Sequence, residues 1–78
     1  MRQRTDRFIV VFATTTDAMH MEQVCRAQGT PGRLVPIPQQ LSAGCGLCWR
    51  ADLADRGQVE QTMRENACHC EAVHVLKL

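Results

Sequence analysis

A run of apolar residues near the start of the chain, Phe8-Ile9-Val10-Val11-Phe12, places the strongest constraint on the fold. The run has the length of a strand, is rich in β-branched and aromatic residues, and does not alternate with polar residues. Such a strand is typically buried on both faces. We therefore expect it to occupy a central position in a sheet, with a covering layer of helices.

The remaining sequence predicts two helices and three further strands. A helix is expected over 17–28, because Thr14 to Asp17 offer N-cap oxygens and Gly29 is a C-cap signal. A second helix is expected to be capped by Asp52 or Asp55 and to end near Asn66. The three further strands are expected over 33–38, 47–51 and 73–78, the first at a sheet edge because it contains two prolines.

This order of elements, βαββαβ, predicts a ferredoxin-like α+β fold. Right-handed crossovers would place both helices on one face of an antiparallel sheet with strand order 4-1-3-2. The chain would form one domain over 1–78, with 1–6 as a flexible tail. The helices would contribute two buried stripes, consisting of Ala18, Met21 and Cys25 on the first helix and Val59 and Met63 on the second.

Composition narrows the classes of function. The net charge of +1 and the three aromatic residues argue against a nucleic-acid partner. The longest apolar run is too short to cross a bilayer, so we expect no membrane insertion. No signal-peptide pattern is recognisable at the N-terminus, which predicts a cytoplasmic protein. In that reducing compartment the five cysteines indicate reactive or metal-binding thiols and not a disulfide framework.

The stretch Leu41 to Cys48 contains the leading candidate for chemistry. Cys45 lies between Gly44 and Gly46, which contribute no packing and bend freely, so we expect its thiol to be exposed and to be the working atom. The topology places it near the N-terminus of the first helix, where the helix dipole would favour a thiolate. Ser42 could donate a hydrogen bond to an anion there, and both glycines are expected to adopt backbone angles closed to other residues.

The other cysteines leave two interpretations open. Cys48 forms a C-x-x-C pair with Cys45 and could resolve a persulfide or form a reversible disulfide, but strand alternation could equally bury it as a small hydrophobe. The predicted topology brings three loops, 13–16, 39–46 and 67–71, to one end of the sheet. A Zn²⁺ or Cu⁺ site is therefore the alternative reading, with ligands drawn from Cys45, Cys48, Cys68, His69 and Cys70.

A family resemblance adds to this reading. Segments 12–19, 32–38 and 41–47, together with Glu22, are similar to a small family labelled selenium/sulfur carrier-like, over about residues 7–76. The proline pair followed by Ser-Ala-Gly-Cys-Gly is the specific part of the match, and Cys45 takes the position of the family's cysteine. The chain departs from the family at Gln39, where arginine is usual, and at Cys48, Cys68 and Cys70, which the family does not generally supply.

The resemblance implies a carrier that is not an enzyme and needs no cofactor. Cys45 would hold a persulfide or selenopersulfide, with Cys48 as a candidate resolving thiol. The donor would be a cysteine desulfurase or a sulfurtransferase that docks at the loop end of the sheet. The sequence leaves open which chalcogen is carried and whether the chain forms a homodimer through its proline-containing edge strand.

Overall fold

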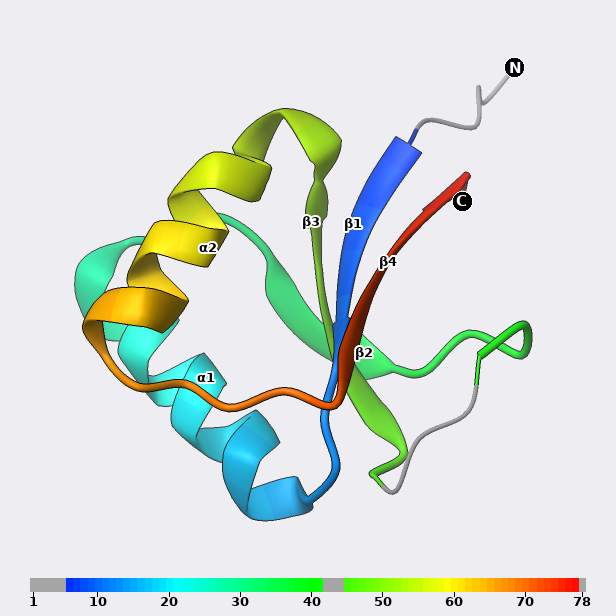
Figure 1. The fold of residues 1–78 in the computed structure, drawn as a ribbon, viewed down its shortest axis with the longest axis horizontal. Coiled ribbons are helices and arrows are strands. Elements are labelled where there is room, and N and C mark those ends of the chain that lie inside the picture. Colours follow the sequence, from blue (N-terminus) through cyan, green and yellow to red (C-terminus); the bar gives the residue numbers. More distant parts are fainter. Residues whose placement is uncertain (1–5, 42–44, 78) are drawn as a thin grey trace.

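A computed structural model of the chain describes residues 6–41 and 45–77 and confirms the predicted ferredoxin-like fold (Figure 1). The sheet is antiparallel with the order β2-β3-β1-β4, which is the predicted 4-1-3-2 arrangement read from the other edge. The elements are β1 (Asp6–Val11), α1 (Thr15–Gln28), β2 (Arg33–Pro36), β3 (Leu47–Asp52), the 3-10 helix η1 (Leu53–Asp55), α2 (Arg56–Glu65) and β4 (Ala72–Lys77).

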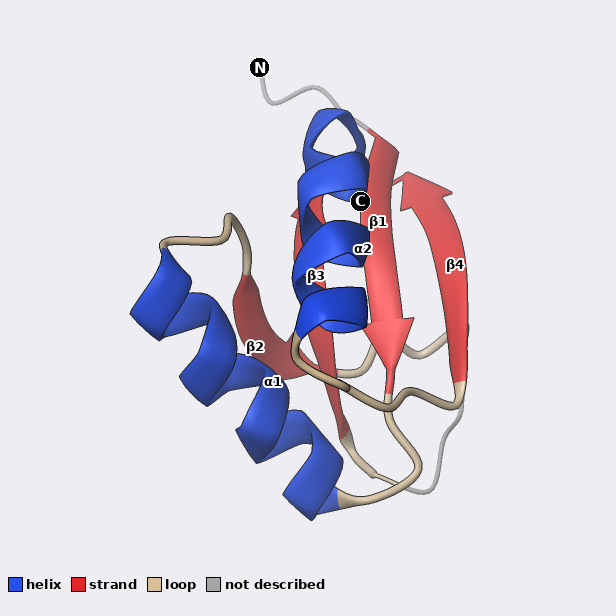
Figure 2. Ribbon diagram, turned by 60° about the vertical axis from the view of Figure 1, so that its left-hand side comes forward, coloured by secondary structure: helices blue, strands red, loops and turns tan. Residues whose placement is uncertain are grey.

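The structure has two layers, with both helices on one face of the sheet (Figure 2). The central strand β1 is buried on both faces, as its composition predicts. Phe8 and Val10 face the helices, whereas Ile9 and Val11 belong to a second apolar cluster on the opposite face. Ile37 and Leu41, from the segment that follows β2, pack against that second cluster and cover part of the face that no helix reaches.

The ends of α1 follow directly from its sequence. The Thr14 hydroxyl accepts a hydrogen bond from the Asp17 amide at 3.1 Å, so the helix begins two residues earlier than predicted. Gly29 ends it in the left-handed conformation, with φ of 69°. The expected stripe of Ala18, Met21 and Cys25 is buried.

Asp55, one of the two predicted caps, is the N-cap residue of α2, but its capping contact differs from the prediction. Neither Asp52 nor Asp55 accepts a capping hydrogen bond through its side chain, because η1 intervenes between β3 and the helix and supplies backbone contacts instead. Asn66 ends the helix, as predicted, and its amide donates to the Thr62 carbonyl oxygen at 3.1 Å. Thr62 is itself buried and bonds the hydroxyl of Thr30, which follows the C-cap of α1, at 2.7 Å. Helical periodicity does not indicate this polar contact.

The turn into β2 depends on the backbone conformation of one glycine. Gly32 has φ of 114°, and a Cβ atom there would lie 2.7 Å from the Arg50 carbonyl oxygen and still closer to the Trp49 indole nitrogen. The same indole nitrogen donates to the Pro31 carbonyl oxygen at 3.1 Å. The turn is therefore fixed against β3, and only glycine fits its backbone.

Candidate functional site

Cys45 lies immediately before β3, beside the N-terminus of α1, as the topology predicts. Its amide donates to the Phe12 carbonyl oxygen at 3.2 Å, which ties the cysteine to the end of β1. Its sulfur lies 3.8 Å from the hydroxyl oxygen of Thr15, the first residue of α1. A thiolate, or a charged group attached to this sulfur, would therefore lie next to the positive end of a helix.

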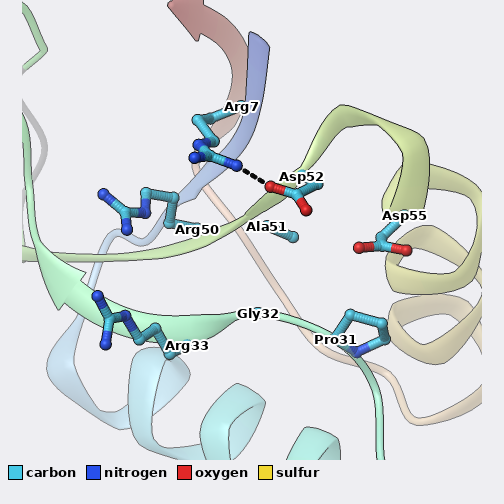
Figure 3. Close-up of a pocket in the computed structure, with 8 residues that line it drawn as sticks. All are labelled: Arg7, Pro31, Gly32, Arg33, Arg50, Ala51, Asp52 and Asp55. Carbon is cyan, nitrogen blue, oxygen red and sulfur yellow. Dashed lines mark hydrogen bonds and ion pairs between the residues drawn. The ribbon is translucent and has the colours of Figure 1, made fainter. Parts of the chain in front are cut away.

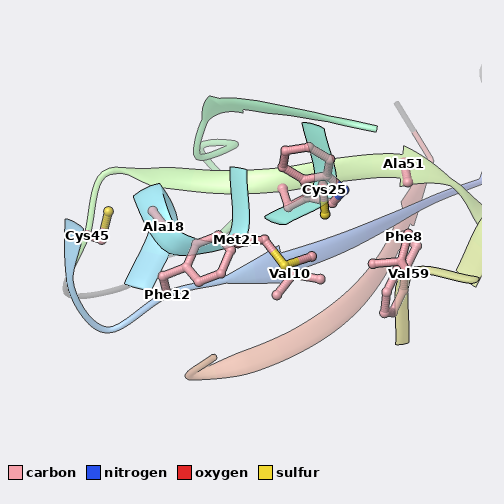
Figure 4. Close-up of a cluster of buried hydrophobic side chains, with 10 residues drawn as sticks. Phe8, Val10, Phe12, Ala18, Met21, Cys25, Cys45, Ala51 and Val59 are labelled. Atoms are coloured by element: carbon pink, nitrogen blue, oxygen red, sulfur yellow. The ribbon is translucent and has the colours of Figure 1, made fainter. Parts of the chain in front are cut away.

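The expectation that the Cys45 thiol is exposed is wrong for this structure. Only 3% of the residue is accessible, and it belongs to the apolar cluster on the helix side of the sheet (Figure 4). Cys45 and Ala18 lie at one end of that cluster, and Phe8 and Val59 at the other. The neighbouring glycines do not leave the thiol accessible, because residues distant in sequence, including those of α1, cover the sulfur.

The residues predicted to support the cysteine divide between described and undescribed parts of the chain. Ser42 and Gly44 lie outside the described residues. Gly46 is described, and the prediction of a special backbone there is wrong. Its φ is outside the left-handed region, and a Cβ atom would meet no neighbouring atom within 4 Å. Its place in the sequence therefore reflects no conformational requirement.

Cys48 belongs to the opposite face of the sheet from Cys45. It is fully buried in the second apolar cluster with Ile9 and Val11, and its thiol points to the Pro36 carbonyl oxygen at a sulfur–oxygen distance of 3.9 Å. Burial raises the pKa of this thiol, partly offset by the charge of Arg50. The geometry therefore favours the interpretation of Cys48 as a small core residue, and its role as a resolving thiol stays a prediction.

The predicted meeting of three loops at one end of the sheet is confirmed at the backbone. Cys45 bonds the end of β1 at Phe12, and the Glu71 amide bonds the neighbouring Val11 carbonyl oxygen at 2.8 Å. The cysteines of these loops nevertheless remain apart. Cys68 and Cys70 line a separate groove of about 270 Å³ along α2 and β4, together with Glu60, Met63, Arg64 and Val73.

The alternative of a metal site finds no support in this arrangement. Within 6–41 and 45–77, which include all five cysteines and His69, no three histidine, cysteine, aspartate or glutamate side chains are placed to share one ion. The reason is the separation just described: Cys45 and Cys48 occupy opposite faces, and Cys70 is exposed in the groove beside α2. A tetrahedral site needs four ligands around one point.

Cys25 has the structural role that its helical position predicts. It is 1% exposed, and burial together with the nearby Cys68 raises its pKa to about 11, although a hydrogen bond with Thr30 acts in the opposite direction. The thiol therefore stays protonated and unreactive at neutral pH. His20, on the same helix, contacts the Asn66 carbonyl oxygen through Nε2 at 3.0 Å.

A charged pocket at the far end of the sheet was not anticipated (Figure 3). It measures about 320 Å³ and brings together charged residues from four parts of the chain: Arg7, Arg33, Arg50, Asp52 and Asp55. Arg7 pairs with Asp52. One part of this pocket could have been predicted. Antiparallel pairing of the second and third predicted strands can set Arg33 opposite Arg50.

The fold and site define a small ferredoxin-like domain with a cysteine set against a helix N-terminus at the end of its sheet. Residues 7–75 match the model of the family described as "Putative Se/S carrier protein-like", and the chain belongs to that family. None of the curated proteins and none of the solved structures compared with the chain is significantly similar to it. Among the described residues, no helix is long and apolar enough to span a membrane.

Proposed function

We propose that this protein carries sulfur or selenium as a persulfide or selenopersulfide on Cys45 and passes it to a partner protein. The observation that carries the proposal is the position of the Cys45 sulfur, 3.8 Å from the Thr15 hydroxyl at the first turn of α1, in a chain that belongs to the Se/S carrier-like family. We expect a carrier and not an enzyme, so the chemistry that generates the chalcogen would belong to the donor.

The loading step is a thiol exchange. The Cys45 thiolate attacks the outer sulfur of a persulfide on the donor, a cysteine desulfurase or sulfurtransferase. A sulfur–sulfur bond forms on Cys45, the donor's own sulfur–sulfur bond breaks, and the donor cysteine leaves as a thiolate. No electrons are gained or lost overall, so no further oxidant is needed. Selenium would follow the same exchange.

The surroundings of Cys45 would act on this exchange in two ways. The Thr15 hydroxyl and the positive end of the α1 dipole would favour negative charge on the persulfide that forms. Burial at 3% exposure works against attack, because a donor cannot reach the sulfur in this conformation. We therefore expect transfer to require local opening around Cys45, and docking of the donor to promote it.

Intact mass spectrometry tests the proposal. The protein is incubated with a cysteine desulfurase and cysteine, and its mass is measured before and after reduction. We expect one added sulfur atom that reduction removes. Cys45→Ser should abolish the addition, whereas Cys70→Ser should not. Cys70 is the matched control because it is the most accessible of the five cysteines and so the first to gain sulfur by unguided chemistry.

Two outcomes would contradict the proposal. One is an unchanged mass for the wild-type protein with desulfurases and sulfurtransferases alike. The other is loss of the added sulfur in Cys70→Ser and its retention in Cys45→Ser. Circular dichroism of each variant establishes that it is folded, and Cys45→Ala provides a second substitution that introduces no hydroxyl into the apolar cluster.

A further inference from the structure

The pocket at the start of β2 contains two guanidinium groups that nothing in the described structure neutralises. Arg33 and Arg50 are direct partners across the antiparallel β2·β3 ladder, so their side chains leave the same face of the sheet. Within 6–41 and 45–77, neither forms an ion pair or a side-chain hydrogen bond, whereas Arg7 is already paired with Asp52. Two like charges directly opposite each other destabilise a ladder, and an anion bound beside them would relieve the repulsion.

The charges in the pocket are separated in space. Figure 3 shows the three arginines on one side and Asp55 with Pro31 on the other. Three guanidinium groups and two carboxylates leave one net positive charge, and the carboxylate nearest to the arginines is the one that Arg7 occupies. An anion would therefore bind on the arginine side and be kept there by repulsion from Asp55.

The hollow beside the arginines is produced by small residues with fixed positions. Gly32 and Ala51 lie in the lining, and neither has a side chain long enough to fill the space. Gly32 is held by its contact with Trp49, whose indole nitrogen bonds the Pro31 carbonyl oxygen. Arg33 follows Gly32 and Arg50 follows Trp49, so one rigid contact sets the backbone positions of both arginines.

We propose that Arg33 and Arg50 form a binding site for a phosphate group, with Arg7 completing its positive side. Planar guanidinium groups bind tetrahedral oxyanions through paired hydrogen bonds, and two adjacent arginines match the charge of a phosphate dianion. The volume of about 320 Å³ leaves room for more than the anion alone. Free phosphate and a phosphate ester share this chemistry. The site lies at the opposite end of the β2·β3 ladder from Cys45 and does not depend on the carrier proposal.

A titration monitored by nuclear magnetic resonance tests the site. Inorganic phosphate is added to the full chain at constant ionic strength, and the arginine Nε–H signals and backbone amides are followed. We expect saturable shifts at Arg33 and Arg50. Arg33→Gln and Arg50→Gln should each weaken binding by about tenfold or more, because each removes a charge-assisted contact. Both substitutions also relieve the cross-strand repulsion, so neither should impair folding.

Two further variants sharpen the assignment. Arg26→Gln removes a charge from the last turn of α1, away from the pocket lining, and should leave phosphate binding unchanged. Asp55→Asn removes the opposing carboxylate and should therefore tighten phosphate binding. A parallel titration with phenyl phosphate separates the two sources of the ligand: tighter binding than inorganic phosphate identifies an ester, and equal or weaker binding identifies the free anion.

The proposal would be overturned by shifts that increase without saturation, which would indicate an adventitious ion only. It would equally be overturned if Arg26→Gln weakened binding as much as Arg50→Gln, since the effect would then reflect net charge and not the pocket. Failure of this test leaves the mass measurement on Cys45 unaffected, because the two experiments use different residues and different ligands.

Discussion

The two ends of the β2·β3 ladder each have a glycine next to a candidate site, but the two glycines have different structural roles. At the arginine end, Gly32 has a left-handed backbone and lies in contact with Trp49, and charged side chains surround an open pocket. At the cysteine end, Gly46 has an ordinary backbone in open space, and the sulfur of Cys45 is buried beside α1. Of these two glycines, only Gly32 marks a structural requirement.

Helix α1 connects the same two ends. Its first turn contacts Cys45 through Thr15, and its last turn contains Cys25 and leads to the Pro31–Gly32 turn. The two cysteines thus have similar burial but different neighbours. Cys45 lies beside the N-terminus of α1, whereas Cys25 belongs to the last turn of the same helix and is hydrogen-bonded to Thr30. We therefore expect Cys45 to be the reactive cysteine and Cys25 to contribute to the stability of the fold.

The largest effect is expected from Gly32→Ala. A Cβ atom at this position would lie 2.7 Å from the Arg50 carbonyl oxygen, and φ of 114° is unfavourable for any residue with a side chain. We expect the free energy of unfolding to fall by about 3 kcal/mol or more. Urea denaturation measures the change. A loss below about 1 kcal/mol would show that the turn adapts and that the arginine end is not rigid.

The second effect concerns the core. Cys25→Ser replaces the thiol with a more polar hydroxyl at a position that is 1% exposed and belongs to the apolar cluster, with Thr30 as the hydrogen-bond partner of the native thiol. We expect a loss of about 1 to 3 kcal/mol in unfolding free energy. Sulfur loading of Cys45 should be retained under conditions where the variant is folded. If Cys25→Ser instead abolished loading without affecting stability, the working thiol would have been assigned to the wrong end of α1.

The pKa of Cys25 predicts a dependence of stability on alkaline pH. Its folded value is about 11, above the value of 9.0 for an unperturbed thiol, so the folded state binds this proton more tightly than the unfolded state. The resulting stabilisation is fully present below pH 9.0 and is lost as pH rises toward about 11. The stability difference between wild type and Cys25→Ala should therefore narrow over this interval. Urea denaturation at several pH values measures this difference. A stability difference that does not change with pH would contradict burial as the origin of the raised pKa.

The smallest effect is expected from Gly46→Ala, the matched control for Gly32→Ala. No atom lies within 4 Å of the added methyl group, and the backbone does not require glycine. We expect a change within about 1 kcal/mol, with a gain in stability favoured because alanine restricts the unfolded chain. Similar unfolding free energies for Gly32→Ala and Gly46→Ala would contradict the claim that the backbone requires glycine at position 32 and not at position 46.

The sequence predicted the architecture because each element carries a local signal. The apolar run 8–12 determined the central strand, Gly29 marked the end of α1, and the prolines indicated an edge strand. The start of α1 was placed two residues too late because 14–17 offers several N-cap oxygens. These signals act over a few residues and agree with one another. The 3-10 helix η1 before α2 was not predicted, because its backbone contact leaves no signature in side-chain type.

The candidate site was less predictable because burial depends on residues distant in sequence. Nothing adjacent to Cys45 indicates that residues of the helix side would cover it, and the spacing of Cys45 and Cys48 does not reveal that the sheet separates them. The alternation of side chains along a strand does not decide the matter, because Cys45 lies before the start of β3. The arginine pocket required the register of β2 against β3, which the sequence alone does not provide.

The most direct test of the account is the position of the added sulfur in the loaded wild-type protein. Trypsin releases residues 34–50 as one peptide, which contains Cys45 and Cys48 and none of the other cysteines. After the persulfide is trapped by alkylation, fragmentation of the chain between these two residues assigns it to one of them. The account predicts the persulfide on Cys45. A persulfide on Cys48, or on the peptide that contains Cys68 and Cys70, would contradict it.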